Sequence, residues 1–129
     1  MVAMQPDTLR FRLSAFLGLT SIWLGASGAH GKLHDAMLAA GTLENWKTGV
    51  SYHLPHAILL ATLALAGAAG GKRGTWAWNF LFAGVLLFSG SLYLHAVTQT
   101  KWLVYVTPFG GVFMMLGWLL LLLARWRRA

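Results

Sequence analysis

Cysteine is absent from the 129 residues of the chain. Disulfide bridges, thiolate metal sites, iron–sulfur clusters and covalently attached c-type haem are therefore excluded. Acidic residues are scarce, since only Asp7, Asp35 and Glu44 stand against ten lysines and arginines. Neither paired carboxylates nor a triplet of nucleophile, base and orienting group can be recognised, so the sequence argues against an enzymatic function.

The chain also lacks any polar stretch long enough to form a soluble domain, and 57% of its residues are hydrophobic. Four apolar runs each approach the roughly 20 residues that cross a bilayer as a helix. We therefore expect an all-α polytopic membrane protein with a single integral membrane domain over residues 1–129. Its four transmembrane helices are expected at about residues 11–29, 43–66, 75–97 and 101–124.

The connections between these runs are short, so neighbouring helices should run antiparallel and form a compact four-helix bundle. The connection between helices one and two is amphipathic and is expected to lie as a short segment at the membrane interface. The glycine-rich residues 67–74 are expected to form a tight turn. Small residues on the helix faces allow close packing. The expected points of close approach among the first three helices are Gly25, Ala29, Gly90 and Ser91.

The basic residues lie at the ends of the apolar runs, where they anchor helices among lipid head groups. Binding to nucleic acid is not expected, because no basic stripe alternates with exposed aromatics. Three basic residues, Lys32, Lys47 and Lys101, fall on one side of the predicted membrane. The other seven fall on the side of both termini and the 67–74 turn. This asymmetry predicts that both termini are cytoplasmic.

The second run contains the stretch Tyr52-His53-Leu54-Pro55-His56. Its two histidines stand at i and i+3, and therefore project from nearly one side of a helix. Pro55 has no N–H, so the carbonyl of Ser51 loses its helical partner. Ionisable side chains inside a membrane span are costly and indicate a functional site.

The predicted threading places all five histidines in the outer half of the bundle. This half also contains the members of a candidate polar pocket: His56, His30, His53, His95, Tyr52 and Ser91. Three functions of this pocket stay open. The histidines could bind a divalent metal through His53, His56 and His95, or haem between His56 and His95. They could line a path for protons or a small ligand. They could also simply bond neighbouring groups, in which case His56 would reach Ser91, Tyr93 or a carbonyl near Gly28.

Four short stretches resemble a known family. They are Gly28-Ala29-His30-Gly31; Tyr52 with His56-Ala57; Leu87-Phe88-Ser89-Gly90-Ser91-Leu92-Tyr93; and Thr107-Pro108-Phe109-Gly110-Gly111 followed by Gly117-Trp118. They are similar to the YgdD-like family of small uncharacterised four-helix membrane proteins, found in bacteria with relatives in mitochondria. The resemblance implies the four-helix topology and a place in the bacterial inner membrane, and it implies no activity.

Two histidines, His30 and His56, fall on positions of these family motifs. His53 and His95 stand where the family is expected to carry glutamine and an apolar residue. The resemblance therefore implies that a site common to the family would use His30, His56, Tyr52, Ser91 and Thr107. Such a set is suited to hydrogen bonding more than to metal binding.

The function favoured by the sequence is that of an accessory subunit, assembly factor or scaffold of a larger membrane complex. Small size, the lack of a soluble domain and the small-residue helix faces point to it. One alternative is a binder of haem, metal or a small ligand through the histidines, and another is a small transporter that acts as an oligomer. The expected partners are the lipid bilayer and either other membrane subunits or further copies of the chain.

Overall fold

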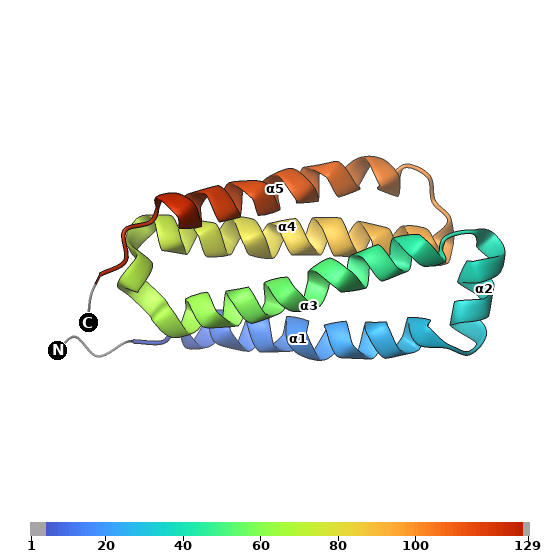
Figure 1. Ribbon diagram of the computed structural model, residues 1–129, viewed down its shortest axis with the longest axis horizontal. Helices are drawn as coiled ribbons and strands as arrows, with labels where there is room; N and C mark the ends of the chain where they lie inside the picture. Colours follow the sequence, from blue (N-terminus) through green and yellow to red (C-terminus); the bar gives the residue numbers. More distant parts are fainter. Residues whose placement is uncertain (1–4, 128–129) are drawn as a thin grey trace.

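The computed structural model describes residues 5–127. The elements are α1 (Thr8–Ala29), α2 (Lys32–Ala40), α3 (Leu43–Ala66), the short 3₁₀ turn η1 (Gly67–Gly70), α4 (Gly71–Thr98) and α5 (Leu103–Leu123). Every element is helical (Figure 1), so the all-α prediction is confirmed. The four long helices have 22, 24, 28 and 21 residues, and each therefore reaches roughly the 30 Å thickness of a hydrocarbon core.

Length and composition alone mark two stretches of the described chain as able to cross a membrane. They are Leu43–Thr98, which comprises α3 and α4, and Leu103–Leu123, which is α5. The first helix is not among them, because arginine, serine and glycine dilute its apolar character.

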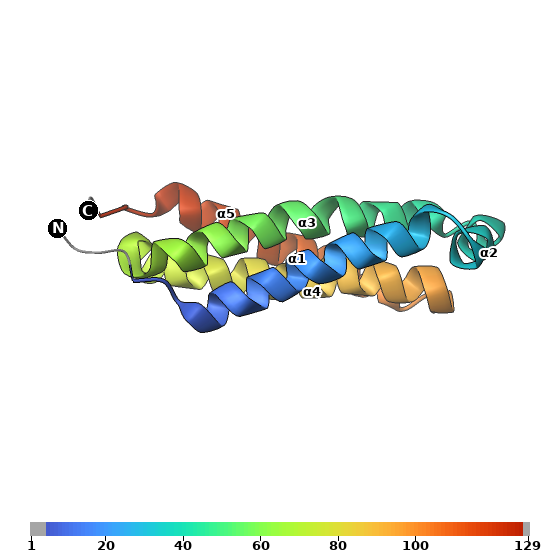
Figure 2. The same ribbon diagram turned by 90° about the horizontal axis from the view of Figure 1, so that it is seen from below.

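The long helices follow one another in the order α1, α3, α4, α5 (Figure 1). α1 packs mainly against α3, α3 against α4, and α4 against α5. Neighbours run antiparallel as predicted, and α2 joins α1 to α3 at the end far from the termini (Figures 1 and 2). The main contacts follow this order, and we call the arrangement a row below; one buried apolar cluster nevertheless contains residues of all four long helices.

The chain reverses between α3 and α4 through two glycines with positive φ, Gly67 at 57° and Gly71 at 61°. α4 already begins at Gly71, one turn earlier than the predicted start at residue 75. The N-terminal segment packs onto this reversal, because the Asp7 N–H donates to the Ala64 carbonyl at 2.9 Å. The C-terminal segment does the same, because the Arg127 N–H donates to the Ala69 carbonyl at 2.9 Å. Both described ends of the chain therefore lie at one end of the molecule.

Two apolar clusters form the core. One lies toward the termini and includes Leu60, Leu81 and Val85, which are almost fully buried. The other lies toward α2 and is centred on Trp46 and Tyr93, whose rings are 4.8 Å apart. Of the polar residues in the predicted outer half, His53, His56 and Ser89 are buried together with these clusters.

Close helix approach occurs mainly between α4 and α5. A Cβ added to Gly84 would meet Met114 and the Gly110 carbonyl oxygen, and one added to Gly117 would meet Leu81. The expectation for Gly90 is wrong, because a Cβ there would have nothing within 4 Å. The close α4–α5 contact uses Gly84 of α4 together with Gly110 and Gly117 of α5.

Candidate functional site

His56 is buried on α3 and bonded through both ring nitrogens. Its Nδ1 lies 2.8 Å from the Tyr52 carbonyl oxygen, and its Nε2 lies 3.1 Å from the indole nitrogen of Trp118 on α5. A carbonyl can only accept and an indole N–H can only donate. The ring proton is therefore assigned to Nδ1, and the lone pair of Nε2 is occupied by Trp118.

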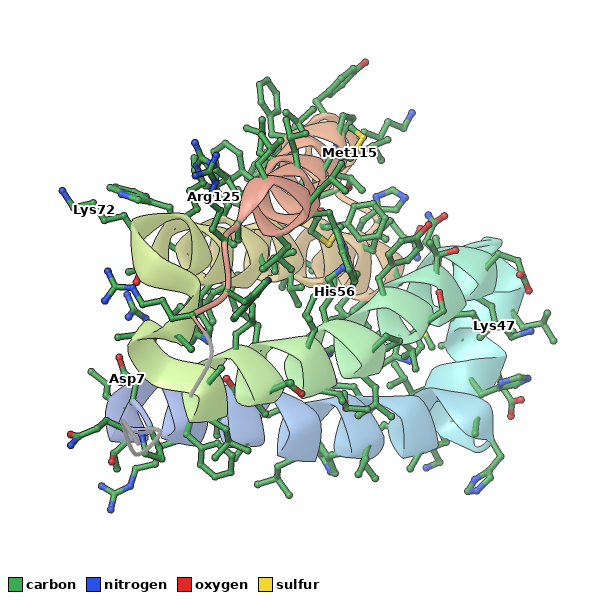
Figure 3. The ribbon with its side chains drawn as sticks, turned by 60° about the vertical axis from the view of Figure 1, so that its left-hand side comes forward. Asp7, Lys47, His56, Lys72, Met115 and Arg125 are labelled. Carbon is green, nitrogen blue, oxygen red and sulfur yellow. The ribbon has the colours of Figure 1, made fainter. Side chains whose placement is uncertain are left out.

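The neighbours of His56 explain how this contact is formed. Gly117 has no side chain, so α5 lies directly against Leu81 of α4. The next residue, Trp118, then projects past α4 toward α3. Figure 3 shows His56 in the interior, between α3 and the α4–α5 pair, whereas Met115 points outward from α5.

His53, one turn away, is buried among different neighbours. Its Nδ1 lies 2.9 Å from the Tyr93 hydroxyl on α4, and its Nε2 lies 3.4 Å from the Thr20 hydroxyl on α1. Thr20 is also within 3.0 Å of the Leu17 carbonyl, to which its hydroxyl donates. A consistent network therefore has Tyr93 donating to Nδ1 and the Nε2–H donating to Thr20. His53 thereby links three helices.

Other polar side chains link the same helices. Ser89 donates to the Gly49 carbonyl at 2.8 Å, and Thr42 donates to the Ala96 carbonyl at 2.8 Å, so both connect the α3 side to α4. Thr42 stands at the N-cap position of α3, but its side chain makes this long-range bond and no cap bond. Ser91 lies 2.7 Å from the Thr107 hydroxyl and connects α4 to α5.

These side chains, together with His53, His56, Tyr93, Thr20 and Trp118, are called the polar layer below. Among residues 5–127, no buried side-chain nitrogen or oxygen lacks a hydrogen-bond partner.

The remaining members of the predicted pocket lie elsewhere. His30 is exposed at the end of α1, and His95 sits at the end of α4, where its Nδ1 is 3.2 Å from the Thr100 carbonyl oxygen. Tyr52 is 44% exposed and packs its ring 4.8 Å from that of Phe88. The structure therefore unites His53 and His56 in one layer but does not bring His30 or His95 to them. In the described part of the chain, no three histidine, aspartate or glutamate side chains gather in an arrangement that could hold a metal.

The prediction that His56 bonds inside the protein is confirmed, but its predicted partners are wrong. Ser91 is bonded to Thr107, and Tyr93 is bonded to His53. The Gly28 carbonyl oxygen lies 2.9 Å from Nδ1 of His34. Each expected partner is thus used by another side chain. Trp118, the actual partner, stands in the middle of an apolar run, where a buried indole N–H needs an acceptor, and this signal could have identified it.

A second polar group, at the terminal end, was not predicted as a unit. The Arg10 guanidinium lies 3.1 Å from the Asp7 carboxylate and 3.0 Å from the Asn79 amide oxygen, and it stacks 5.1 Å from the Trp78 ring centre. Asp7, Arg10 and Trp78 border a cavity of about 300 Å³, which is also lined by Thr75 and by residues of the α3–η1 turn. Arg10 is held by three partners, so this group joins α1 to α4.

Comparison with known proteins gives a consistent result. A family described as "Protein of unknown function (DUF423)" matches residues 24–111. The UPF0382 membrane protein YwdK of Bacillus subtilis is 40% identical over 115 residues, which cover 87% of this chain and 91% of the relative. The UPF0382 membrane protein SAB0533 of Staphylococcus aureus is 33% identical over 120 residues, covering 91% and 94%. A UPF0382 membrane protein of Haemophilus influenzae is 36% identical over 107 residues, covering 83% and 85%. No solved structure matches the chain.

Proposed function

Because the chain belongs to the DUF423 family of small membrane proteins of unknown function, as its motifs predicted, we propose that it is an accessory subunit, assembly factor or scaffold of a larger membrane complex. In this proposal the four long helices all cross the membrane. The polar layer holds them together and carries out no chemistry of its own.

The proposal rests on the hydrogen bonding of the polar layer, whose ring nitrogens already have partners within the protein. A site for a ligand, an ion or a proton needs polar atoms that are free to bind it. Here the ring nitrogens of His53 and His56 are already engaged by Tyr93, Thr20, Tyr52 and Trp118. Hydrogen bonds between neighbouring helices are a recognised source of cohesion in membrane proteins. The polar layer is therefore best explained as a set of hydrogen bonds that holds neighbouring helices together.

The outer faces of α1 and α5 support a role in contact with other proteins. α1 and α5 present large side chains to the outside, among them Phe16 and Trp23 on α1 and Tyr105 and Phe109 on α5. Lipid can cover such faces, and so can the helices of a partner subunit.

The test is the size of the native assembly. A tagged copy at its natural expression level would be extracted in a mild detergent and compared by native electrophoresis with the purified chain. The proposal predicts a larger species that contains one partner protein in a fixed ratio, and that the tagged partner recovers the chain in return. Migration of the native chain with the purified chain would contradict it.

Metal analysis and an absorption spectrum of the purified protein address the alternative of haem or metal binding. The proposal predicts less than one metal or haem per chain after purification without chelator. Stoichiometric metal or a haem absorption band that is lost in a His56→Gln variant would overturn it in favour of a cofactor site.

We further propose that both termini face the cytoplasm of the bacterial inner membrane. The described ends of the chain lie together (Figure 1). By the bounds of the helices, that end also holds the basic residues Arg10, Arg12, Lys72, Arg73, Arg125 and Arg127, whereas Lys32, Lys47 and Lys101 belong to the other end. Arg128, the seventh basic residue of the predicted cytoplasmic side, is outside the described residues. A reporter enzyme that works only in the cytoplasm should be active when it is fused after Ala129. Activity only of a reporter that works outside the membrane would refute the orientation.

A further inference from the structure

A basic groove lies at the end of the molecule where α4 begins and α5 ends. Residues 70–73 form one wall, and residues 125–127 form the other. The volume of the groove is about 560 Å³. In Figure 3, Lys72 and Arg125 lie at this end, and Lys47 lies at the opposite end. The groove is separate from the polar layer described above.

Specific contacts hold the two walls together. The Arg127 N–H donates to the Ala69 carbonyl at 2.9 Å, and the Arg73 guanidinium donates to the Leu123 carbonyl at 2.6 Å. The Trp126 ring covers Gly70, where an added Cβ would lie 3.0 Å from the indole. The segment after α5 is therefore fixed across the start of α4, and the groove is a built feature of the fold.

Among the described residues, the groove is lined by four cations and by no carboxylate. Lys72, Arg73, Arg125 and Arg127 are all exposed. Within residues 5–127 the ion pairs are Asp7 with Arg10 and Glu44 with Lys47, and neither involves these four. Four like charges around one groove repel one another unless an anion lies among them. The uncapped start of α4, at the same place, adds the positive end of a helix dipole.

Exposed apolar side chains stand in the adjoining turns of α4 and α5. Trp76, Leu122 and Leu123 are 57%, 80% and 50% exposed. Trp126 is also exposed, and tryptophan prefers the level of lipid head groups. An occupant of this site would therefore meet cations at one end and apolar side chains at the other. That combination matches a phospholipid more closely than a free phosphate ion.

We propose that the groove binds the phosphate head group of an anionic phospholipid, with the acyl chains along Trp76, Leu122 and Leu123. Arginine binds phosphate oxygens through two parallel N–H donors, so Arg125 and Arg127 act as the main anchors, and Lys72 contributes a point charge. The site requires that this end of the row lies at a membrane surface. It does not require that the chain is a subunit of a complex.

The experiment measures lipid binding to the purified full-length chain by native mass spectrometry. The probes are phosphatidylglycerol and phosphatidylcholine with identical acyl chains, and glycerol 3-phosphate as a competitor without acyl chains. Each basic residue near a membrane surface contributes about fivefold to binding of anionic lipid. The wild type should therefore prefer phosphatidylglycerol by about tenfold or more.

Removing two of the anchors should abolish this preference. The Arg125→Gln, Arg127→Gln double variant should bind the two lipids within about twofold of each other, because it removes both of the residues proposed to bind the phosphate through paired N–H donors. The matched control is Lys32→Gln, Lys101→Gln, which removes the same charge from the other end and should keep the preference. If the double variant does not elute as a helical monodisperse protein, Lys72→Gln replaces it and should reduce the preference several-fold.

Three results would overturn the proposal. One is a wild type that does not distinguish the two lipids. Another is an equal loss of preference in the control variant, which would show that overall charge and not the groove is responsible. The third is displacement of phosphatidylglycerol by an equal concentration of glycerol 3-phosphate, which would make the site one for a free phosphate group.

Discussion

Replacing Gly110 with alanine tests the contact by which α5 is joined to the rest of the row. A Cβ on Gly110 would meet the Phe88 nitrogen, and it would lie 2.8 Å from both the Gly84 carbonyl oxygen and the Phe88 Cα. All three atoms belong to the backbone of α4, so no side chain can rotate away to make room. The two helices must separate, or one must bend.

The expected magnitude follows from two opposing terms. Overpacking of this kind costs about 1–3 kcal/mol, and the upper part of that range applies where backbone atoms are struck. Alanine in place of glycine in a helix stabilises by about 1 kcal/mol. The net expectation for Gly110→Ala is therefore a loss of about 1–2 kcal/mol in the free energy of unfolding.

Two neighbouring glycines serve as controls. A Cβ on Gly111 would lie 3.8 Å from the Phe88 ring, which is an ordinary contact, and a Cβ on Gly90 would have nothing within 4 Å. Both alanine variants should be unchanged or more stable by up to about 1 kcal/mol. The assay is reversible unfolding in detergent followed by circular dichroism. If Gly110→Ala were as stable as Gly111→Ala, the close approach of α4 and α5 would be wrong.

Three further variants probe hydrogen bonds between helices, which contribute about 0.6 kcal/mol on average and up to about 1.7 in membrane proteins. Trp118→Phe removes the indole donor to His56 and should lower the unfolding free energy by about 1–2 kcal/mol, because Nε2 is left without a partner. The loss should be smaller when His56 is already replaced by leucine, and equal losses in both backgrounds would mean that the pair does not interact. Tyr93→Phe removes the hydroxyl that bonds His53 and should lower the unfolding free energy by about 1 kcal/mol in the same assay, whereas no change would mean that the hydroxyl is not engaged. Thr42→Val removes the bond to Ala96 at nearly constant volume and should lower the unfolding free energy by about 1 kcal/mol. Hydrogen exchange at the α2 end should become faster, and an unchanged exchange pattern would mean that the bond is absent.

The sequence was a good guide to the helices. The apolar runs predicted α3 at the residues where the structure has it, and they predicted the end of α1 at residue 29. The start of α4 was misplaced by one turn, because Gly71 to Gly74 read as a turn although all four are helical. Glycine lowers helix propensity only by about 1 kcal/mol per residue, and packing of α4 against its neighbours outweighs that.

The partners of the polar residues could not be predicted in the same way. Periodicity places His56 on one face of α3, but it does not give the rotation of α3 relative to α5. The prediction directed His56 toward helices one and three of the predicted set. In the structure, Gly117 allows α5 to approach α4 closely, and the next residue, Trp118, lies beside His56.

In the proposed role, the histidines of the polar layer hold the helices together and are not free to bind a ligand. Nitrogen NMR of the protein labelled at histidine can test this, with Trp118→Phe to assign the His56 signals. We expect that Nδ1 of His56 is protonated, that Nε2 is unprotonated and hydrogen-bonded, and that neither signal moves when one equivalent of Zn²⁺ or haem is added. A shift of the His56 and His53 nitrogens at one equivalent of either would contradict it.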